Sequence, residues 1–332
     1  MKTASFPSTR LRRLRQQEKI RRLIREAHLS VNDLVYPLFI KYGRGANVPI
    51  DSMPGQYQIT LENLATEIKE ITALNIPAVL LFGIPAEKDP TGADAHSDNG
   101  IVQQAIHIIK KIAPALLVIS DICCCEFTDH GHCGIIDDSS GKLDINNDQT
   151  LAILQKQALA HATAGADILA PSGMMDGMVQ AIRSILDEYH YSHIPILSYS
   201  VKYASALYGP FRDAAEGTPQ FGDRHSHQMD IANANEALRE VELDINEGAD
   251  ILMVKPAITY LDVIYRLKQN YPQIPLAAYH VSGEYSMLKA AVEKGWLDEK
   301  NVVLENMFAL KRAGTDFIIT YFAKDIAKWL TL

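Results

Sequence analysis

Residues 248–256 read GADILMVKP. Glycine suits the left-handed position that follows a helix, and the short apolar run after it is typical of a buried parallel strand. The same arrangement returns at residues 165–169 (GADIL) and at residues 314–318 (GTDFI). We interpret the three stretches as one recurring turn from helix to strand, not as a sequence duplication. The chain is therefore predicted to alternate helices with parallel strands.

Working outward from these turns, short apolar runs bounded by Gly, Pro or Asp predict eight strands, at residues 36–40, 78–82, 116–120, 167–170, 194–198, 250–254, 276–280 and 316–320. Amphipathic segments between them predict helices at residues 61–71, 104–112, 151–164, 179–189, 234–246, 261–270, 287–294 and 302–313. Eight such units predict an α/β fold of the (β/α)8 TIM-barrel type, with an extended N-terminal arm. A doubly wound open sheet is the alternative, but no Gly-rich phosphate-binding motif follows the first strand.

The composition is that of an ordinary globular enzyme. The chain has 332 residues, of which 47% are hydrophobic and 22% charged, and its net charge is -8. An acidic chain argues against nucleic acid or an anionic membrane as the main partner. We find no signal peptide and no apolar run that could span a bilayer. Four cysteines, three of them consecutive, do not resemble a disulfide framework, so we expect a reducing, cytoplasmic location.

One segment departs from the acidic average, because eight Arg and Lys residues lie between residues 10 and 25. A nucleic-acid-binding arm, an organellar transit peptide and an arm packed on another subunit are the three interpretations. Leu11, Leu14, Leu23 and Ile24 contribute to an apolar stripe, and interspersed glutamates are unusual in transit peptides. We favour the packing arm and divide the chain into an arm, residues 1–30, and a catalytic barrel, residues 31–332.

Two lysines close neighbouring apolar strands. Lys202 follows the fifth predicted strand, and Lys255 follows the sixth. Active sites of these barrels lie at the carboxyl ends of the strands. Burial there disfavours the charged amine, and a neutral amine is what addition to a carbonyl requires. The sequence therefore indicates Lys255 as a Schiff-base lysine with Lys202 as a second cation nearby, while the alternative is that each lysine caps its strand and extends to solvent.

A cysteine cluster follows the third predicted strand. Cys123 and Cys125 face the same side of an extended chain, Cys124 faces the other side, and Cys133 returns after a seven-residue loop. Three sulfur ligands leave one tetrahedral position for water or substrate, as in catalytic zinc sites. Nearby groups that could be outer ligands or a fourth ligand are Asp121, His130 and His132. The alternative is that the thiols are merely buried apolar groups.

These motifs resemble the delta-aminolevulinic acid dehydratase family over residues 11–330. The resemblance is carried by DICCCEFTDHGHCG at 121–134, SVKY at 200–203, YGPFRDA at 208–214, MVKPA at 253–257 and YHVSGE at 279–284. It implies a lyase of tetrapyrrole (heme) biosynthesis that condenses two molecules of 5-aminolevulinate to porphobilinogen, with loss of two waters. The family usually has Asp at the position of Gly173, Arg at that of Met178, and other residues at those of His225 and His227.

The resemblance also implies roles for single residues. Lys255 would form a Schiff base with the first substrate, and Lys202 would hold the second covalently. The carboxylate of the first substrate would bind Ser282 and Tyr321, and that of the second would bind Arg212, Arg224 and Gln228. Cys123, Cys125 and Cys133 would bind a catalytic Zn²⁺, and Glu240 an allosteric Mg²⁺.

The N-terminal arm and the segment after the fifth strand are also expected to serve the active site and its assembly. The resemblance implies a homo-octamer whose arms embrace neighbouring barrels. Segment 208–224 is long, polar and punctuated by Gly and Pro, and we interpret it as an active-site lid. The alternatives are an aldolase-like barrel with one Schiff-base lysine and no metal, a zinc-stabilised scaffold, and an RNA binder that uses the basic arm.

Overall fold

A computed structural model describes residues 5–138 and 141–331 of the chain. Residues 1–4 of the predicted arm, and residues 139–140 and 332 of the predicted barrel, lie outside the described residues. The central strands are β1 (Leu34–Lys41), β4 (Ala78–Ile84), β5 (Leu117–Ile122), β8 (Ile168–Pro171), β9 (Leu197–Lys202), β10 (Ile251–Lys255), β11 (Leu276–His280) and β12 (Phe317–Thr320). All their pairings with one another are parallel, in the order β8-β5-β4-β1-β12-β11-β10-β9.

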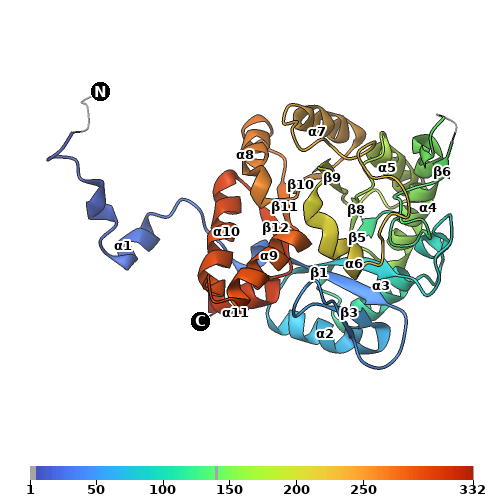
Figure 1. Ribbon diagram of the computed structural model, residues 1–332, viewed down its shortest axis with the longest axis horizontal. Helices are drawn as coiled ribbons and strands as arrows, with labels where there is room; N and C mark the ends of the chain where they lie inside the picture. Colours follow the sequence, from blue (N-terminus) through green and yellow to red (C-terminus); the bar gives the residue numbers. More distant parts are fainter. Residues whose placement is uncertain (1–4, 139–140, 332) are drawn as a thin grey trace.

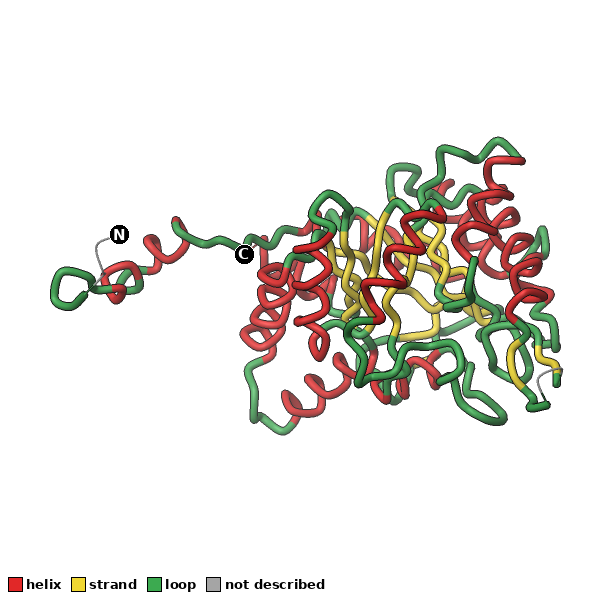
Figure 2. The backbone as a smooth tube through the Cα atoms, turned by 90° about the horizontal axis from the view of Figure 1, so that it is seen from above, coloured by secondary structure: helices red, strands yellow, loops and turns green. Residues whose placement is uncertain are grey.

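The ring closes where the two ends of this order meet. A parallel bridge joins Leu169 of β8 to Ile196, which directly precedes β9. Helices cover the outside of the strands, as Figures 1 and 2 show. The predicted (β/α)8 barrel is therefore confirmed, and the open-sheet alternative is wrong.

The outer layer consists of helices, most of which bury one apolar face against the strands. Its members are α2 (Leu61–Ala73), α3 (Ile101–Ile112), α4 (Asn147–Ala164), α5 (Met178–Glu188), α7 (Glu236–Glu247), α8 (Leu261–Asn270), α9 (Ser282–Glu293), α10 (Glu299–Ala313) and α11 (Ala323–Thr331). Five helices begin earlier than predicted, and α4 and α9 begin earliest of all relative to the prediction, by four and five residues, because their first turns are polar. The Asn146 side chain accepts from Gln149 N and starts α4, while Glu284 accepts from Val281 N and starts α9.

Several other predicted boundaries need correction. The fifth strand was predicted at residues 194–198 but runs over Leu197–Lys202, because the Ser198, Tyr199 and Ser200 side chains are buried although two of them are polar. The apolar pattern also misses the short paired strands β2 (Val48–Pro49) with β3 (Tyr57–Thr60), and β6 (Ile136–Asp137) with β7 (Asp144–Ile145). Strands of this length carry too few residues for a period to be read.

The recurring helix-to-strand turn has a physical reason. Gly165, Gly248 and Gly314 adopt φ angles of 102, 106 and 114°, which favour glycine over residues with a Cβ. The aspartate two residues later accepts a hydrogen bond from a backbone N–H next to it in the barrel. These pairs are Asp167 with Val118 at 2.6 Å, Asp250 with Ile196 at 2.8 Å and Asp316 with Leu276 at 2.8 Å. The repeated Gly-x-Asp pattern thus ends a helix and fixes the start of a strand.

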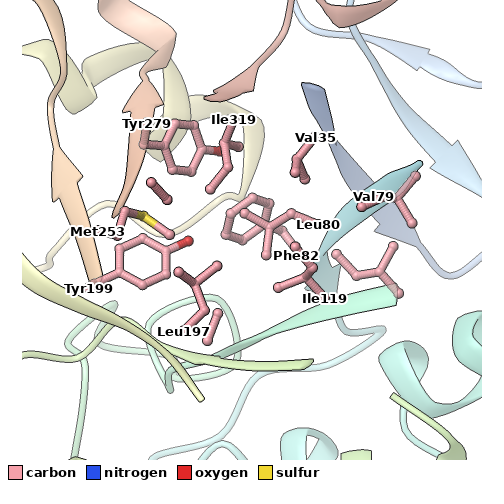
Figure 3. Packing of buried hydrophobic residues seen from close by; sticks show 14 of the residues in the cluster. Val35, Val79, Leu80, Phe82, Ile119, Leu197, Tyr199, Met253, Tyr279 and Ile319 are labelled. Carbon is pink, nitrogen blue, oxygen red and sulfur yellow. The ribbon is translucent and has the colours of Figure 1, made fainter. Parts of the chain in front are cut away.

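The barrel interior is packed with side chains. Leu80, Leu197, Met253 and Ile319 come from four different strands and lie together between them, as Figure 3 shows. Tyr199 and Tyr279 lie in the same layer, and both rings are fully buried. The chain therefore builds a filled barrel core, as expected of this fold.

The N-terminal segment leaves the barrel as an extended arm (Figures 1 and 2). It contains a 3-10 turn at Leu11–Leu14 and α1 (Glu18–Leu23), and no residue of either is buried. Leu11 and Leu23 are 67% and 85% exposed. A helix this short, with its apolar side chains in solvent, needs a packing partner to be stable. Among the described residues, no helix combines the length and apolar character needed to cross a bilayer.

Candidate active site

The two strand-end lysines lie side by side at the carboxyl end of the barrel. Lys202 of β9 and Lys255 of β10 are register partners, and they are 4% and 5% exposed. Their Nζ atoms lie 5.7 and 5.0 Å from the centroid of the Tyr199 ring. The structure thus brings both predicted amines into one buried cavity, whose polar lining is Cys125, Glu126, Ser172, Lys202, Arg224 and Lys255.

Lys255 is enclosed by aromatic rings. Its Nζ atom lies 4.5 Å from the ring centroid of Tyr279, 5.0 Å from that of Phe211 and 5.3 Å from that of Tyr208. Burial lowers the pKa of Lys255 to about 7, and the neighbouring Lys202 ammonium lowers it as well, against the opposing effect of Asp121. A large fraction of Lys255 is therefore the free amine at neutral pH.

Lys202 is held by a hydrogen bond to the residue that follows β8. Its Nζ atom donates to the Ser172 carbonyl at 2.6 Å, and the Ser172 hydroxyl donates to Asp121 Oδ2 at 2.9 Å. Burial raises the pKa of Asp121 to about 8, and Glu126 raises it further, while the two lysines lower it. Asp121 is thus a carboxyl group that can hold or release a proton near neutral pH, close to both amines.

Three cysteines converge beside the lysines. The Sγ atoms of Cys123, Cys125 and Cys133 all lie within 4.8 Å of one another, and the first two are 3.4 Å apart. Tetrahedral ligands with a zinc–sulfur bond of about 2.3 Å are separated by roughly 3.8 Å, so the cluster fits such an ion. All four cysteines are free thiols, and Cys124 lies outside the cluster, as the alternation predicted.

The surroundings of this cluster are strongly charged. Hydrogen bonds from Cys123 and Cys125 lower the pKa of Cys133 well below its usual value, and Arg224 adds to the effect. The Glu126 side chain is 2% exposed, and it forms a second candidate ligand group with Asp121 and Cys123. Sequence reasoning missed Glu126, although an acid directly after the cysteines at a barrel mouth was the available signal. The described residues therefore contain a possible metal site.

The predicted lid, residues 208–224, covers the cavity. It begins with the short helix α6 (Gly209–Ala214), which places the Phe211 ring 4.9 Å from that of Phe82 of the barrel. The backbone N–H of Phe211 donates to the Ser282 hydroxyl at 2.9 Å. The lid is therefore closed against the strand ends, and it seals Lys255 from bulk water.

Two predicted carboxylate-binding arginines lie on this lid. Arg224 is 5% exposed, and its Nη2 atom donates to the carbonyls of Gly131 and Gly217 at 2.9 and 3.1 Å. Burial lowers the pKa of Arg212, and the nearby Arg224 lowers it further. Within residues 5–138 and 141–331, neither Nε atom has a hydrogen-bond partner. Both guanidinium groups therefore keep donors for an anion.

Ser282 and Tyr321 occupy the Lys255 side of the barrel. Ser282 is the first residue of α9, and Tyr321 directly follows β12; each is 1% exposed. The Tyr321 hydroxyl lies 3.0 Å from that of Tyr279, whose ring contacts Lys255. Neither side chain lines the lysine cavity itself; Ser282 is linked to it through the backbone N–H of Phe211, and Tyr321 through the hydroxyl of Tyr279.

Gln228 and Glu240 are placed elsewhere. Both line a separate cavity of about 520 Å³ with Asp144, Asp176 and His227. Gln228 is 4% exposed, and neither of its side-chain polar atoms has a partner among the described residues. Burial raises the pKa of Glu240 to about 7, and Asp244 and Glu236 raise it further. The structure therefore does not bring Gln228 into the wall of the lysine cavity.

Comparison with known proteins identifies relatives of nearly full length. A model of the delta-aminolevulinic acid dehydratase family matches residues 8–329. The chain is 55% identical to the delta-aminolevulinic acid dehydratase of Synechocystis sp., over 98% of this chain and 99% of that protein. It is 56% identical to that of Halalkalibacterium halodurans, over 97% and 96%. The crystal structure of the Toxoplasma gondii enzyme with the product porphobilinogen superposes with a TM-score of 0.93, at 44% identity, covering 97% and 91%.

Proposed function

We propose a mechanism with two lysine Schiff bases and a zinc ion for this chain, which belongs to the delta-aminolevulinic acid dehydratase family. The chain is a porphobilinogen-forming enzyme of tetrapyrrole biosynthesis. In this proposal it condenses two molecules of 5-aminolevulinate to porphobilinogen with loss of two waters. The observation that carries the proposal is the register pairing of Lys202 with Lys255 in one buried cavity.

The first step is the addition of Lys255 to the ketone carbon of one 5-aminolevulinate. The free amine that burial favours at neutral pH attacks this carbon, and one water leaves as the Schiff base forms. The iminium then acts as an electron sink and makes the neighbouring carbon acidic. Asp121 can accept and return a proton at this point, because its pKa lies near neutrality.

Lys202 holds the second 5-aminolevulinate in the same way, with loss of a second water. Because the lysines pair across adjacent parallel strands, the two bound carbons face each other across one cavity. The acidified carbon of one substrate adds to the imine carbon of the other, and loss of a further proton from that carbon expels the first lysine as a free amine. The amine of one substrate then adds to the remaining imine carbon and expels the second lysine, and loss of a ring proton gives the pyrrole. Both lysines are thereby regenerated, and the two waters lost on imine formation are the net loss.

Polar groups on two sides would orient the substrates. Ser282 and Tyr321 would bind the carboxylate of the first substrate, beside Lys255. Arg212 and Arg224 would bind that of the second, because their unpaired donors suit a planar carboxylate. The assisting role of Gln228 stays a prediction, since its side chain lines the neighbouring cavity.

Cys123, Cys125 and Cys133 would hold the zinc ion, since their mutual distances suit a tetrahedral thiolate site with one open position. When bound, zinc supplies Lewis-acid chemistry at an oxygen and lowers the pKa of a bound water toward about 7. Glu240 would ligate an allosteric Mg²⁺, and the acidic groups that raise its pKa would favour a cation there.

The assembly is part of the same proposal. Leu11, Leu14, Leu23 and Ile24 are all exposed on the arm, which supports a homo-octamer whose arms pack on neighbouring barrels. The division into an arm at residues 1–30 and a catalytic barrel at residues 31–332 follows from that. The free thiols support a reducing compartment, which for this protein would be the cytoplasm.

Pyrrole formation from 5-aminolevulinate, followed with Ehrlich's reagent, tests the proposed function. We expect colour that disappears after chelation and returns with Zn²⁺. Absence of colour with and without zinc would refute the proposal.

A further inference from the structure

The lid is held at its base by an ion pair that the proposed chemistry does not use. Lys41, the last residue of β1, places its Nζ atom 2.5 Å from Glu216 Oε1. Gln58 of β3 donates to the same oxygen at 3.1 Å, and its own Oε1 accepts from Lys41 at 3.0 Å. These three side chains form a closed triangle between the barrel and the lid.

Two further contacts hold the same part of the lid. Lys88, four residues after β4, donates to the Glu216 carbonyl at 2.5 Å. Gln58 also donates to the Ala214 carbonyl at 2.9 Å. The Glu216 backbone has a φ of 51°, a left-handed conformation that costs free energy for a residue with a side chain. Contacts from three separate barrel segments thus stabilise a turn that is locally unfavourable.

The residue after this turn connects the two arginines. The Gly217 N–H donates to the Arg212 carbonyl at 3.0 Å, and the Gly217 carbonyl accepts from Arg224 Nη2 at 3.1 Å. A Cβ atom on Gly217 would lie 3.1 Å from the Cys125 carbonyl, so this glycine packs directly on the cysteine loop. Gly217, directly after Glu216, is therefore bonded to the backbone of Arg212 and to the guanidinium of Arg224, so the position of Glu216 bears on both arginines.

We propose that Lys41 and Glu216 are positioning residues, whose ion pair holds Gly217 in place and so keeps Arg212 and Arg224 ready to receive a substrate carboxylate. The inference rests on the proposed function, because it takes the two arginines as the groups that bind the second 5-aminolevulinate. Two cations repel each other before the anion binds, so an external clamp lowers the cost of ordering them.

Substitutions that remove the charge but keep the side-chain shape test this role. In Lys41→Met and Glu216→Gln we expect KM for 5-aminolevulinate to rise about fivefold, the effect of a partly exposed ion pair, while kcat changes less than about twofold. The reciprocal swap Lys41→Glu with Glu216→Lys should recover most of the KM loss. Lys289→Met is the matched control, because Lys289 forms an equally short pair with Glu299, far along the chain from the lid.

Amide hydrogen exchange of residues 209–220 in the ligand-free protein gives a second readout that needs no turnover. We expect faster exchange in both single variants than in the Lys289→Met control, with recovery in the swap. If KM stays at the control value, the positioning role is overturned, whether or not exchange changes. A wild-type protein that forms no porphobilinogen would instead refute the proposed function, while faster exchange in the variants would still support the clamp.

Discussion

Lys202 and Lys255 occupy directly paired positions on β9 and β10, and both amines approach the Tyr199 ring. Parallel pairing points the side chains of partner residues to the same face of the sheet. Burial lowers the pKa of Lys255, and the positive charge of Lys202 beside it lowers this pKa further. The same pairing presents two carbonyl-binding groups to one cavity, which a condensation of two identical substrates requires.

Reduction with borohydride in the presence of 5-aminolevulinate should trap the substrate on Lys255. We expect Lys255→Ala to lose the adduct at this peptide and to lower kcat by about 1,000-fold or more, because covalent activation is removed. Lys202→Ala should keep the Lys255 adduct but form no product. Peptide mass mapping identifies the modified lysine. An adduct on neither lysine in the wild-type protein would refute the mechanism.

The rate of this trapping should depend on pH through the free amine of Lys255. Because its pKa is lowered to about 7, the reactive form increases as the pH rises from 6 to 8. Trapping at saturating borohydride should therefore increase with a midpoint near pH 7. In Lys202→Met the neighbouring positive charge is gone, so the midpoint should move to higher pH. A wild-type midpoint close to that of free lysine would contradict the assigned environment.

Removal of one predicted zinc ligand should strongly lower activity without unfolding the protein. For Cys133→Ser we expect a loss on the order of 100-fold or more, since a metal contributes several kcal/mol to the barrier. Cys124→Ala is the control, because its thiol is equally buried but lies outside the cluster. It should keep one zinc per active site by metal analysis. If circular dichroism shows that chelation unfolds the wild-type barrel, the metal would be structural instead.

Glu284 should stabilise the loops that carry two site residues. Its Oε1 atom accepts from Ile258 N, three residues after Lys255, and its Oε2 atom accepts from Val281 N, directly before Ser282, both at 2.6 Å. Glutamine can satisfy only one of these donors, so Glu284→Gln should lower the free energy of unfolding by about 2 kcal/mol. Glu293→Gln, an exposed change on the same helix, serves as the comparison. Equal denaturant midpoints for the two variants would contradict this role.

Much of the fold was predictable because its signals are local. The Gly-x-Asp turns at residues 165, 248 and 314 end helices through backbone angles that glycine favours, and short apolar runs mark buried strands. The fifth strand was predicted to begin three residues and to end four residues too early, since Ser198 and Ser200 are buried by neighbours that the local pattern cannot reveal. The lysines and cysteines were predictable as candidates because they stand where strands end.

What local pattern could not reveal is how distant segments meet. The aromatic rings around Lys255 come from β11 and from the lid. Glu126 is buried by the closed barrel mouth. Gln228 reaches its cavity because of the path that the chain takes after Arg224. The pKa of each group follows from this burial and from charges that are far apart in the chain. Residue type and spacing therefore specify which groups are available, whereas long-range packing specifies which of them share a cavity and in what protonation state.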